Sequence, residues 1–255
     1  MAKIGVEYIE HFPHLRATGA FDGADDLVTP YYIAEWFVPR LVQAGHTAPI
    51  FRRDQAAEEK DLRDVSQGGA DSTNADSVDL FFIITHGRYD NHETHLAFDI
   101  QKDDWVGSSG KWKFGENCNL EWLMIYGCHT IDSDNVLDHH HIFKGLHLIC
   151  GAYSWMYDSW TCCEVGADTA ENLASGKTVC ASWIDGVSDW WAENHPMVIS
   201  VEKNDTWRNG NPDWPSTVIG SDHLWGHGTT RADIPPSQQH WMAAIWSDSG
   251  VWDYG

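Results

Sequence analysis

Two apolar runs in the chain each end in a reactive side chain beside a glycine. The first, DLFFIITHG, leads to His86 and Gly87, and the second, LEWLMIYGC, leads to Gly127 and Cys128. A cysteine attacks a carbonyl carbon as the thiolate, and a nearby histidine can take the thiol proton and pass it to a leaving group. Glycine permits a tight turn and lets a substrate carbonyl approach backbone N–H donors that bind an oxyanion. The two runs therefore predict acyl-transfer chemistry.

The elements that must position these residues are two neighbouring strands. Residues 80–85 and 120–126 are continuously apolar rather than alternating, which is typical of central strands in a sheet covered on both faces. Strand, helix and strand patterns follow one another along the chain. They predict an α/β fold, a three-layer sandwich with a mostly parallel, twisted sheet and helices on both faces. Because ligands gather beyond the carboxyl ends of such strands, we expect His86 and Cys128 at one edge.

The remaining elements are predicted from periodicity and from helix-end signals. In chain order they are a strand at 3–12, a helix at 30–44, a strand at 47–54, a surface helix or helical turn at 55–65, a strand ending at 151 and a helix at 160–176. Thr29 and Pro30 supply a cap and a first-turn proline for the first helix, and Gly45 closes it.

The 255 residues are enough to bury a substantial core in one large domain. Residues 1–204 are predicted to form this α/β domain. Residues 205–255 are rich in Gly, Pro, Asn and Trp with little periodicity, so they are predicted to be a loop-rich C-terminal extension packed on the same domain.

Several motifs between Leu80 and Gly186 resemble those of the caspase-like cysteine peptidases, and most of all their CHAT branch. The motifs are FFIITHGRYDNHETHLAFD, LMIYGCHTID, IFKGLHLICGAYSWMYDS and ENLASGKTVCASW, in the order and approximate spacing of that family. The resemblance implies a caspase-like sandwich. It also implies that His86 is the general base and acid, that Cys128 is the nucleophile and that the Gly87 N–H helps to bind the oxyanion.

Substrate-binding residues are assigned more loosely. The family draws acidic residues for its substrate pocket from the loop after the first strand, and Asp22, Asp25 and Asp26 stand there. CHAT-like proteins usually have Ser-Ala before the cysteine and an acidic residue after it, whereas this chain has Tyr126-Gly127 before Cys128 and His129 after it. Further candidates for contact with the substrate are Tyr126, His129 and Trp155.

The net charge of −22 argues against sequence-independent binding of nucleic acid, which needs basic residues, and is compatible with a cationic ligand. No apolar run is long enough to span a membrane, and the start MAKIGVEYIEHF lacks a secretory pattern, so a cytoplasmic location is expected. The cysteines are therefore expected to be reduced, and they stand at positions 118, 128, 150, 162, 163 and 180.

Two other motifs are predicted to be structural. GHGTTRA at 226–232 resembles the histidine motif of subtilisin-like peptidases, but no matching serine motif is present, so His227 is only a distant candidate for the site. The three histidines of DHHHIF at 138–143 point in different directions on a helix, which predicts a solvated helix end. DSDN at 132–135 lacks the rest of a calcium loop. Neither a metal nor a cofactor is predicted.

The leading functional prediction is a cysteine-dependent hydrolase, an endopeptidase that acts through a thioester at Cys128 and prefers a basic residue at the cleavage position. The expected partner is then a peptide or protein substrate. Two alternatives stay open. In the first, the scaffold is repurposed for cyclisation or acyl transfer on a small hydrophobic metabolite, which the 15 tryptophans would help to hold. In the second, the protein binds a partner without catalysis.

Overall fold

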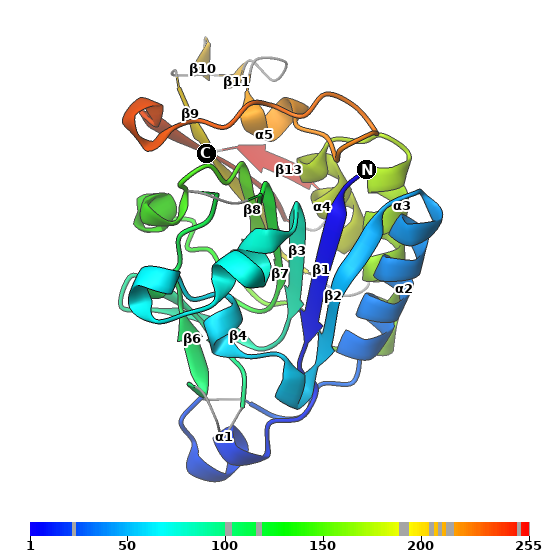
Figure 1. The fold of residues 1–255 in the computed structure, drawn as a ribbon, viewed down its shortest axis with the longest axis vertical. Helices are drawn as coiled ribbons and strands as arrows, with labels where there is room; N and C mark the ends of the chain where they lie inside the picture. The colour runs from blue at the N-terminus through cyan, green and yellow to red at the C-terminus, as the bar shows by residue number, and fades with distance from the viewer. Residues whose placement is uncertain are drawn as a thin grey trace.

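A central sheet organises the computed structural model, which describes residues 1–21, 24–99, 104–115, 119–188, 194–203, 207–208, 211–212, 217–248 and 251–254. Within these residues the sheet has eight strands (Figure 1). Their order across the sheet is β2 (Thr47–Arg53), β1 (Lys3–Tyr8), β3 (Leu80–Ile84), β7 (Trp122–Tyr126), β8 (Leu148–Ala152), β9 (Pro196–Glu202), β12 (Trp241–Asp248) and β13 (Val251–Tyr254).

The first five of these strands run parallel, and the last three are antiparallel to their neighbours. Every residue of β3, β7, β8 and β9 is buried, as expected for continuously apolar strands covered on both faces, whereas β2 at the edge is largely exposed. The predicted α/β fold with a mostly parallel sheet is confirmed.

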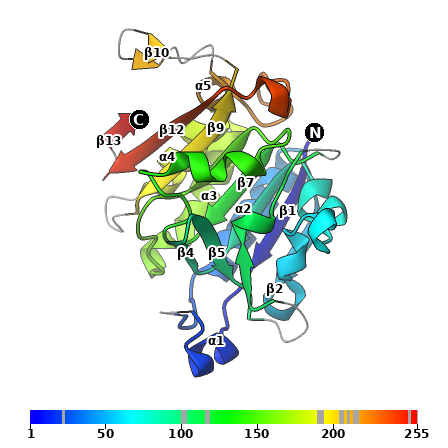
Figure 2. The ribbon, with the colours of Figure 1, turned by 90° about the vertical axis from the view of Figure 1, so that its left-hand side faces the viewer.

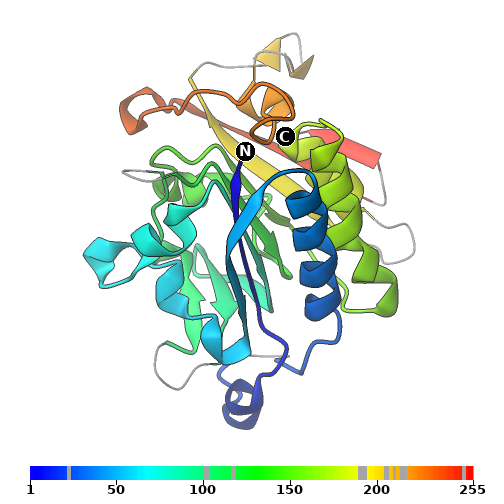
Figure 3. The same cartoon turned by 45° about the vertical axis from the view of Figure 1, so that its right-hand side comes forward.

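One face of the sheet is covered by α-helices, on the right in Figure 3. They are α2 (Pro30–Gln43), α3 (Val165–Ala174) and α4 (Val179–Val187), which pack in sequence against one another and against β1, β8 and β9. The α2–α3 contact is close, because a Cβ built on Gly166 would lie 2.0 Å from the carbonyl oxygen of Ile33. Glycine at that position therefore sets the spacing of the two helices.

The other face is covered by short 3-10 helices and a small sheet, on the left in Figure 3. The 3-10 helices there are η2 (Glu59–Asp61), η3 (Val65–Gln67), η4 (Asp71–Thr73), η5 (Ala75–Ser77), η6 (Ser109–Lys111) and η7 (Val136–Ile142). The small sheet is antiparallel and consists of β4 (Gly87–Asp90), β5 (Glu93–Ala97) and β6 (Val106–Ser108). The polar segment 55–65 thus forms helical turns rather than a regular surface helix. Its Asp61 carboxylate is buried in an ion pair with Arg52.

The remaining short elements are η1 (Asp54–Ala56), η8 (Trp160–Glu164), η10 (Pro236–Gln238), α1 (Pro13–Thr18), α5 (Val218–Ser221), β10 (Trp207–Arg208) and β11 (Asn211–Pro212). Figure 2 shows that β12 and β13, from the C-terminal segment, extend the sheet beyond β9. The segment after residue 204 therefore contributes strands as well as loops. Among the described residues, no helix combines the length and the apolar composition needed to cross a bilayer.

Candidate active site

The carboxyl ends of β3 and β7 bring His86 and Cys128 to one pocket. Ile84 and Tyr126 are register partners at the ends of the two parallel strands, and each reactive residue follows two positions later. Both side chains line a cavity of about 20 Å³, which is room for about one water molecule. The cavity is further lined by Leu27, Thr29, Pro30, Ile84, Thr85, Tyr126, Gly127, Met156 and Asp158.

The glycines beside the two reactive residues allow the strand ends to touch. A Cβ built on Gly127 would lie 2.7 Å from the carbonyl oxygen of Thr85 and 3.3 Å from the nitrogen of Gly87. A Cβ on Gly87 would lie 2.6 Å from the carbonyl oxygen of Cys128. Real Cβ atoms do not approach backbone this closely, so a side chain at either position would push the histidine and cysteine loops apart.

The His86 ring is held in one tautomer by a backbone carbonyl. Its Nε2 lies 2.7 Å from the carbonyl oxygen of Asp25, which can only accept a hydrogen bond. Nε2 therefore carries the proton, and Nδ1 keeps the lone pair that a general base needs. The ring packs on Phe12 with 4.8 Å between centroids. Burial lowers the pKa of His86, against the opposing effects of the Asp25 carbonyl and the Asp158 carboxylate, so the neutral imidazole is favoured.

The Cys128 thiol is tied to the loop that follows β8. Its Sγ accepts a hydrogen bond from the nitrogen of Met156 at 3.3 Å and donates one to the carbonyl oxygen of the same residue at 3.4 Å. Burial raises the pKa of Cys128, and the bond from Met156 opposes that shift. The shifts therefore favour a neutral thiol and a neutral imidazole in the pocket rather than a preformed ion pair.

Alkylation of Cys128 should consequently rise only in the alkaline range. Because the thiol pKa is raised, less thiolate is present at neutral pH than in a free cysteine, whose pKa is about 8.5. We expect the rate of reaction with iodoacetamide, followed by mass spectrometry, to have its midpoint above that value. The fully buried Cys180 should stay unmodified in the same digest. A rate that is already maximal near neutral pH would instead indicate a preformed thiolate.

A backbone N–H for oxyanion binding is available at Gly87. Ala97 donates a hydrogen bond to the carbonyl of His86, and Gly87 is the register partner of Leu96. In an antiparallel pair, hydrogen-bonded and non-hydrogen-bonded positions alternate, so the Gly87 N–H is turned away from β5. It lies on the side where Gly127 and Cys128 approach.

Asp158 is a pocket residue that sequence reasoning missed. Its carboxylate accepts hydrogen bonds from the nitrogens of Val28 and Thr29, at 2.6 and 2.8 Å, and from the Thr29 hydroxyl. These contacts join the loop before α2 to the loop after β8, and Thr29 and Asp158 both line the pocket. The quoted motif AYSWMYDS contains Asp158, but the sequence gives no sign that its partners lie 129 and 130 positions earlier.

Replacing Asp158 should open the pocket. In Asp158→Ala the two loops lose their shared acceptor, and hydrogen bonds to a charged group contribute about 1.5–3 kcal/mol each before solvent screening. We expect alkylation of Cys128 at a fixed pH to become roughly 10-fold faster, which corresponds to about 1.4 kcal/mol. The exposed Asp134→Ala is a matched control and should leave the rate unchanged. An equal rate in Asp158→Ala and wild type would show that these contacts do not limit access.

Three further candidates lie at or near the pocket. Tyr126 lines it, but its side chain is buried and its hydroxyl donates to the carbonyl of Tyr157 at 2.8 Å, so it acts mainly as a wall. His129 has a positive φ of 47° and packs edge-on against Trp155, with 4.8 Å between centroids. Trp155 is 59% exposed. Neither His129 nor Trp155 lines the cavity, although each is next in sequence to a residue that does.

Of the predicted acidic residues, the two that the structure describes, Asp25 and Asp26, do not line the cavity. Asp22 lies outside the described residues. Asp25 contributes its carbonyl oxygen to His86, while its side chain is exposed. The carboxylate of Asp26 accepts from the nitrogen of Phe12 at 3.1 Å and lies 3.6 Å from Arg16. Among the described residues, Asp158 is the acid that lines the cavity.

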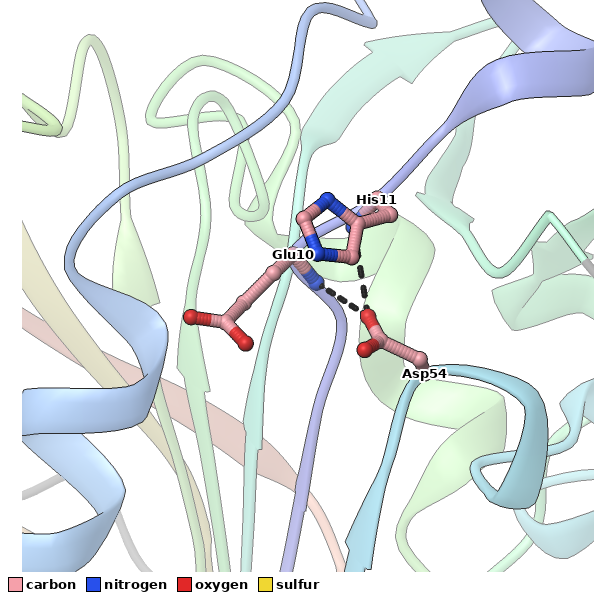
Figure 4. Close-up of side chains that lie close together, drawn as sticks. All are labelled: Glu10, His11 and Asp54. Atoms are coloured by element: carbon pink, nitrogen blue, oxygen red, sulfur yellow. Dashed lines mark hydrogen bonds between the residues drawn. The ribbon is translucent and has the colours of Figure 1, made fainter.

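A neighbouring cluster supports the segment that carries Phe12. Figure 4 shows that Asp54, beyond β2, accepts hydrogen bonds from the backbone nitrogens of Glu10 and His11, at 2.8 and 3.2 Å. Arg53 forms ion pairs with Glu10 and Asp54, at 2.7 and 3.0 Å. The cluster fixes the chain just after β1, which in turn holds the Phe12 ring against His86.

The motifs predicted to be structural lie away from the pocket. His227 pairs with His46, with 2.9 Å between their Nε2 atoms, just before β2 begins and hence at the opposite end of the sheet. The prediction of a solvated helix end at 138–143 is wrong for His139. That side chain is buried in η7, and its ring packs at a tilt against Tyr89 with 5.8 Å between centroids.

A family model described as "Domain of unknown function (DUF6345)" matches residues 15–248. The chain belongs to this family. A search of curated proteins found no match.

Solved structures similar to the chain include two caspases. Caspase-1 from Spodoptera frugiperda is 14% identical, with a TM-score of 0.41, over 73% of this chain and 76% of that one. The Drosophila initiator caspase Dronc is 12% identical, with a TM-score of 0.40, over 73% and 71%. A secreted C11 cysteine protease from Bacteroides thetaiotaomicron is 10% identical, with a TM-score of 0.32, over 78% and 65%. These similarities concern the fold and assign no activity, and the resemblance to the CHAT branch stays a prediction.

Proposed function

We propose that the protein is a cysteine-dependent hydrolase, an endopeptidase in which Cys128 is the nucleophile and His86 transfers the proton. The observation that carries the proposal is the shared pocket at the ends of β3 and β7. There the His86 ring is fixed through Nε2 by the Asp25 carbonyl, while the thiol lines the same cavity. A thiol and an imidazole act as a unit when they come within hydrogen-bond reach, and the shared pocket supports that arrangement.

In the proposed reaction, the thiol proton moves to His86 Nδ1 as Sγ attacks the substrate carbonyl carbon. The oxyanion accepts a hydrogen bond from the Gly87 N–H. Nδ1 then gives the proton to the departing amine, the C–N bond breaks and a thioester remains on Cys128. Water attacks the thioester while His86 takes its proton, which returns to sulfur as the carboxylic acid leaves. General-base transfer at the moment of attack is consistent with the neutral resting pair.

The proposed substrates have a basic residue at the cleavage position. Asp158 supplies a carboxylate on the pocket wall, and the chain has a net charge of −22. A positive side chain is attracted to such a site, and it can pair with Asp158 once the two loops separate. The cavity in the closed arrangement is too small for an arginine or lysine side chain, so binding requires that opening.

The test is cleavage of a fluorogenic peptide library that varies the residue before the scissile bond. We expect cleavage after Arg or Lys by wild type and none by Cys128→Ala. Cys163→Ala, which removes a buried thiol elsewhere, is the matched control and should retain activity. No cleavage by wild type, or equal cleavage by Cys128→Ala, would refute the peptidase proposal.

The lining of the cavity favours a second candidate function, acyl transfer on a small hydrophobic metabolite. Leu27, Pro30, Ile84 and Met156 give the pocket a largely apolar wall, which suits a small apolar acyl group. This function would leave the peptide library uncut, yet Cys128 would form a covalent adduct with short-chain acyl thioesters, detectable by intact-protein mass spectrometry. Failure of both reactions would favour a binding protein without catalysis.

A further inference from the structure

A second cluster of ionisable side chains lies at the opposite end of the sheet from Cys128. Glu121 and His147 immediately precede β7 and β8, and Asp233 comes from the C-terminal segment. One ligand atom from each residue lies within 4.8 Å of the other two. Figure 1 shows α5, which leads into this segment, at the end of the sheet opposite α1.

His147 is the centre of this cluster and is held rigidly. Its side chain is 1% exposed, and its Nδ1 lies 2.9 Å from an Asp222 oxygen. That carboxylate also accepts a hydrogen bond from the indole of Trp122 at 2.6 Å. A histidine that ligates a metal through Nε2 usually donates its Nδ1 proton to a carboxylate in this way, which fixes the tautomer and the direction of the ring.

Among the described residues, the other ring nitrogen is buried and makes ion-pair contacts but no regular hydrogen bond. His147 Nε2 lies 3.0 Å from a Glu121 oxygen and 3.6 Å from an Asp233 oxygen, but neither contact has the geometry of a hydrogen bond. Around a tetrahedral Zn²⁺ ion with bonds of about 2.0–2.2 Å, neighbouring ligand atoms lie roughly 3.3–3.6 Å apart, and the two measured separations lie near that range. The spacing therefore fits atoms that share a metal ion.

Charge supports the same conclusion. Glu121, Asp222 and Asp233 direct three carboxylates toward a single imidazole. Converging carboxylates repel one another, and a divalent cation relieves that repulsion more completely than one imidazolium can.

We propose that Glu121, His147 and Asp233 bind a divalent cation of the Zn²⁺ class, with Asp222 orienting His147. Nitrogen and carboxylate ligands suit Zn²⁺, and three protein ligands leave a coordination position for water. Because Asp233 is 61% exposed and belongs to the C-terminal segment, the ion would fasten that segment to the starts of β7 and β8. The site is separate from the Cys128 pocket and lies at the opposite end of the sheet.

The other group of this kind among the described residues consists of Glu10, His11 and Asp54 and is called the Glu10 group (Figure 4). It differs from the His147 cluster in its partners. Arg53 lies 2.7 Å from Glu10 and 3.0 Å from Asp54, so a cation is already present there. Asp54 also accepts two backbone hydrogen bonds. The Glu10 group therefore provides a control in which similar residues are not expected to bind metal.

The test is equilibrium dialysis of the chelator-treated, full-length protein against Zn²⁺, combined with thermal unfolding. We expect wild type to bind one equivalent tightly and to gain thermal stability. Asp233→Ala and Glu121→Gln should each weaken that binding at least 10-fold, as loss of a ligand requires. His11→Ala, in the Glu10 group, should bind Zn²⁺ as wild type does.

The metal-free Tm separates the metal site from a simple ion-pair cluster. If the three carboxylates form a metal site, removing the exposed Asp233 carboxylate leaves the Tm of the metal-free protein unchanged or raises it. The reason is that the repulsion between the carboxylates is relieved. If they only pair with an imidazolium, the same change lowers the Tm and Zn²⁺ has no effect. No Zn²⁺ binding by wild type, or equal binding by Asp233→Ala and Glu121→Gln, would overturn the proposal.

Discussion

His86→Ala should lower kcat/KM for a basic peptide substrate by roughly 10²- to 10⁴-fold, the usual contribution of a positioned general base. The proposed role of Nδ1 is to accept the thiol proton during attack and to deliver it to the departing amine. Removal of the ring should therefore slow both transfers while leaving the thiol in place. Initial rates at several substrate concentrations give kcat and KM separately, and the loss should lie mainly in kcat.

Two controls separate this effect from damage to the fold. His95→Ala removes another partly exposed ring, which makes a 3.3 Å hydrogen bond to the Asp90 carbonyl, and it should retain activity. Alkylation of Cys128 at alkaline pH should persist in His86→Ala, because the thiol itself remains. Unchanged kcat/KM in a folded His86→Ala protein would remove His86 from the proposed mechanism.

Gly127→Ala should impair both stability and activity. The added methyl group would meet the Thr85 carbonyl oxygen at 2.7 Å, and this oxygen belongs to backbone that cannot rotate away. Overpacking of this kind costs about 1–3 kcal/mol, and displacement of a reacting group by about 1 Å can reduce the rate about 100-fold. We expect a lower free energy of unfolding in urea and a kcat/KM reduced at least 100-fold.

Gly45→Ala is a matched comparison, since it tests stability loss alone. Gly45 follows α2 at a φ of 97° with open space around its Cα, so alanine there is strained without a clash. The expected cost is about 1–2 kcal/mol. Its activity should stay near that of wild type because the pocket is untouched. If Gly127→Ala lost no more activity than Gly45→Ala, close approach of the strand ends would not matter for function.

The central strands could be predicted because their amino-acid composition reflects their burial. The runs at 80–84 and 122–126 are apolar at every position, and only a strand covered on both faces needs that pattern. Their ends then placed His86 and Cys128 at one edge, since parallel strands present their carboxyl ends together. The secondary structure of segment 55–65 is harder to predict from the sequence, because a polar helix and a series of helical turns have similar compositions.

Pocket walls and hydrogen-bond partners could not be predicted, because they join residues far apart in the chain. The Asp25 carbonyl lies 61 positions before His86, and a backbone carbonyl has no sequence signature. Asp158 reaches Val28 across 130 positions, whereas the acids expected from the sequence, such as Asp26, pair with nearby groups instead. A carboxylate of this kind is recognised only when the loops around it are in place.

The sequence by itself determined the α/β class, the central parallel strands and the positions of His86 and Cys128 at their ends, because apolar runs and local periodicity follow from burial. Only the tertiary structure decided three other properties. It fixes the tautomer of His86, it raises the pKa of Cys128 by burying the thiol, and it brings Glu121, His147 and Asp233 together. These properties depend on distances and desolvation between segments that only the folded chain brings together.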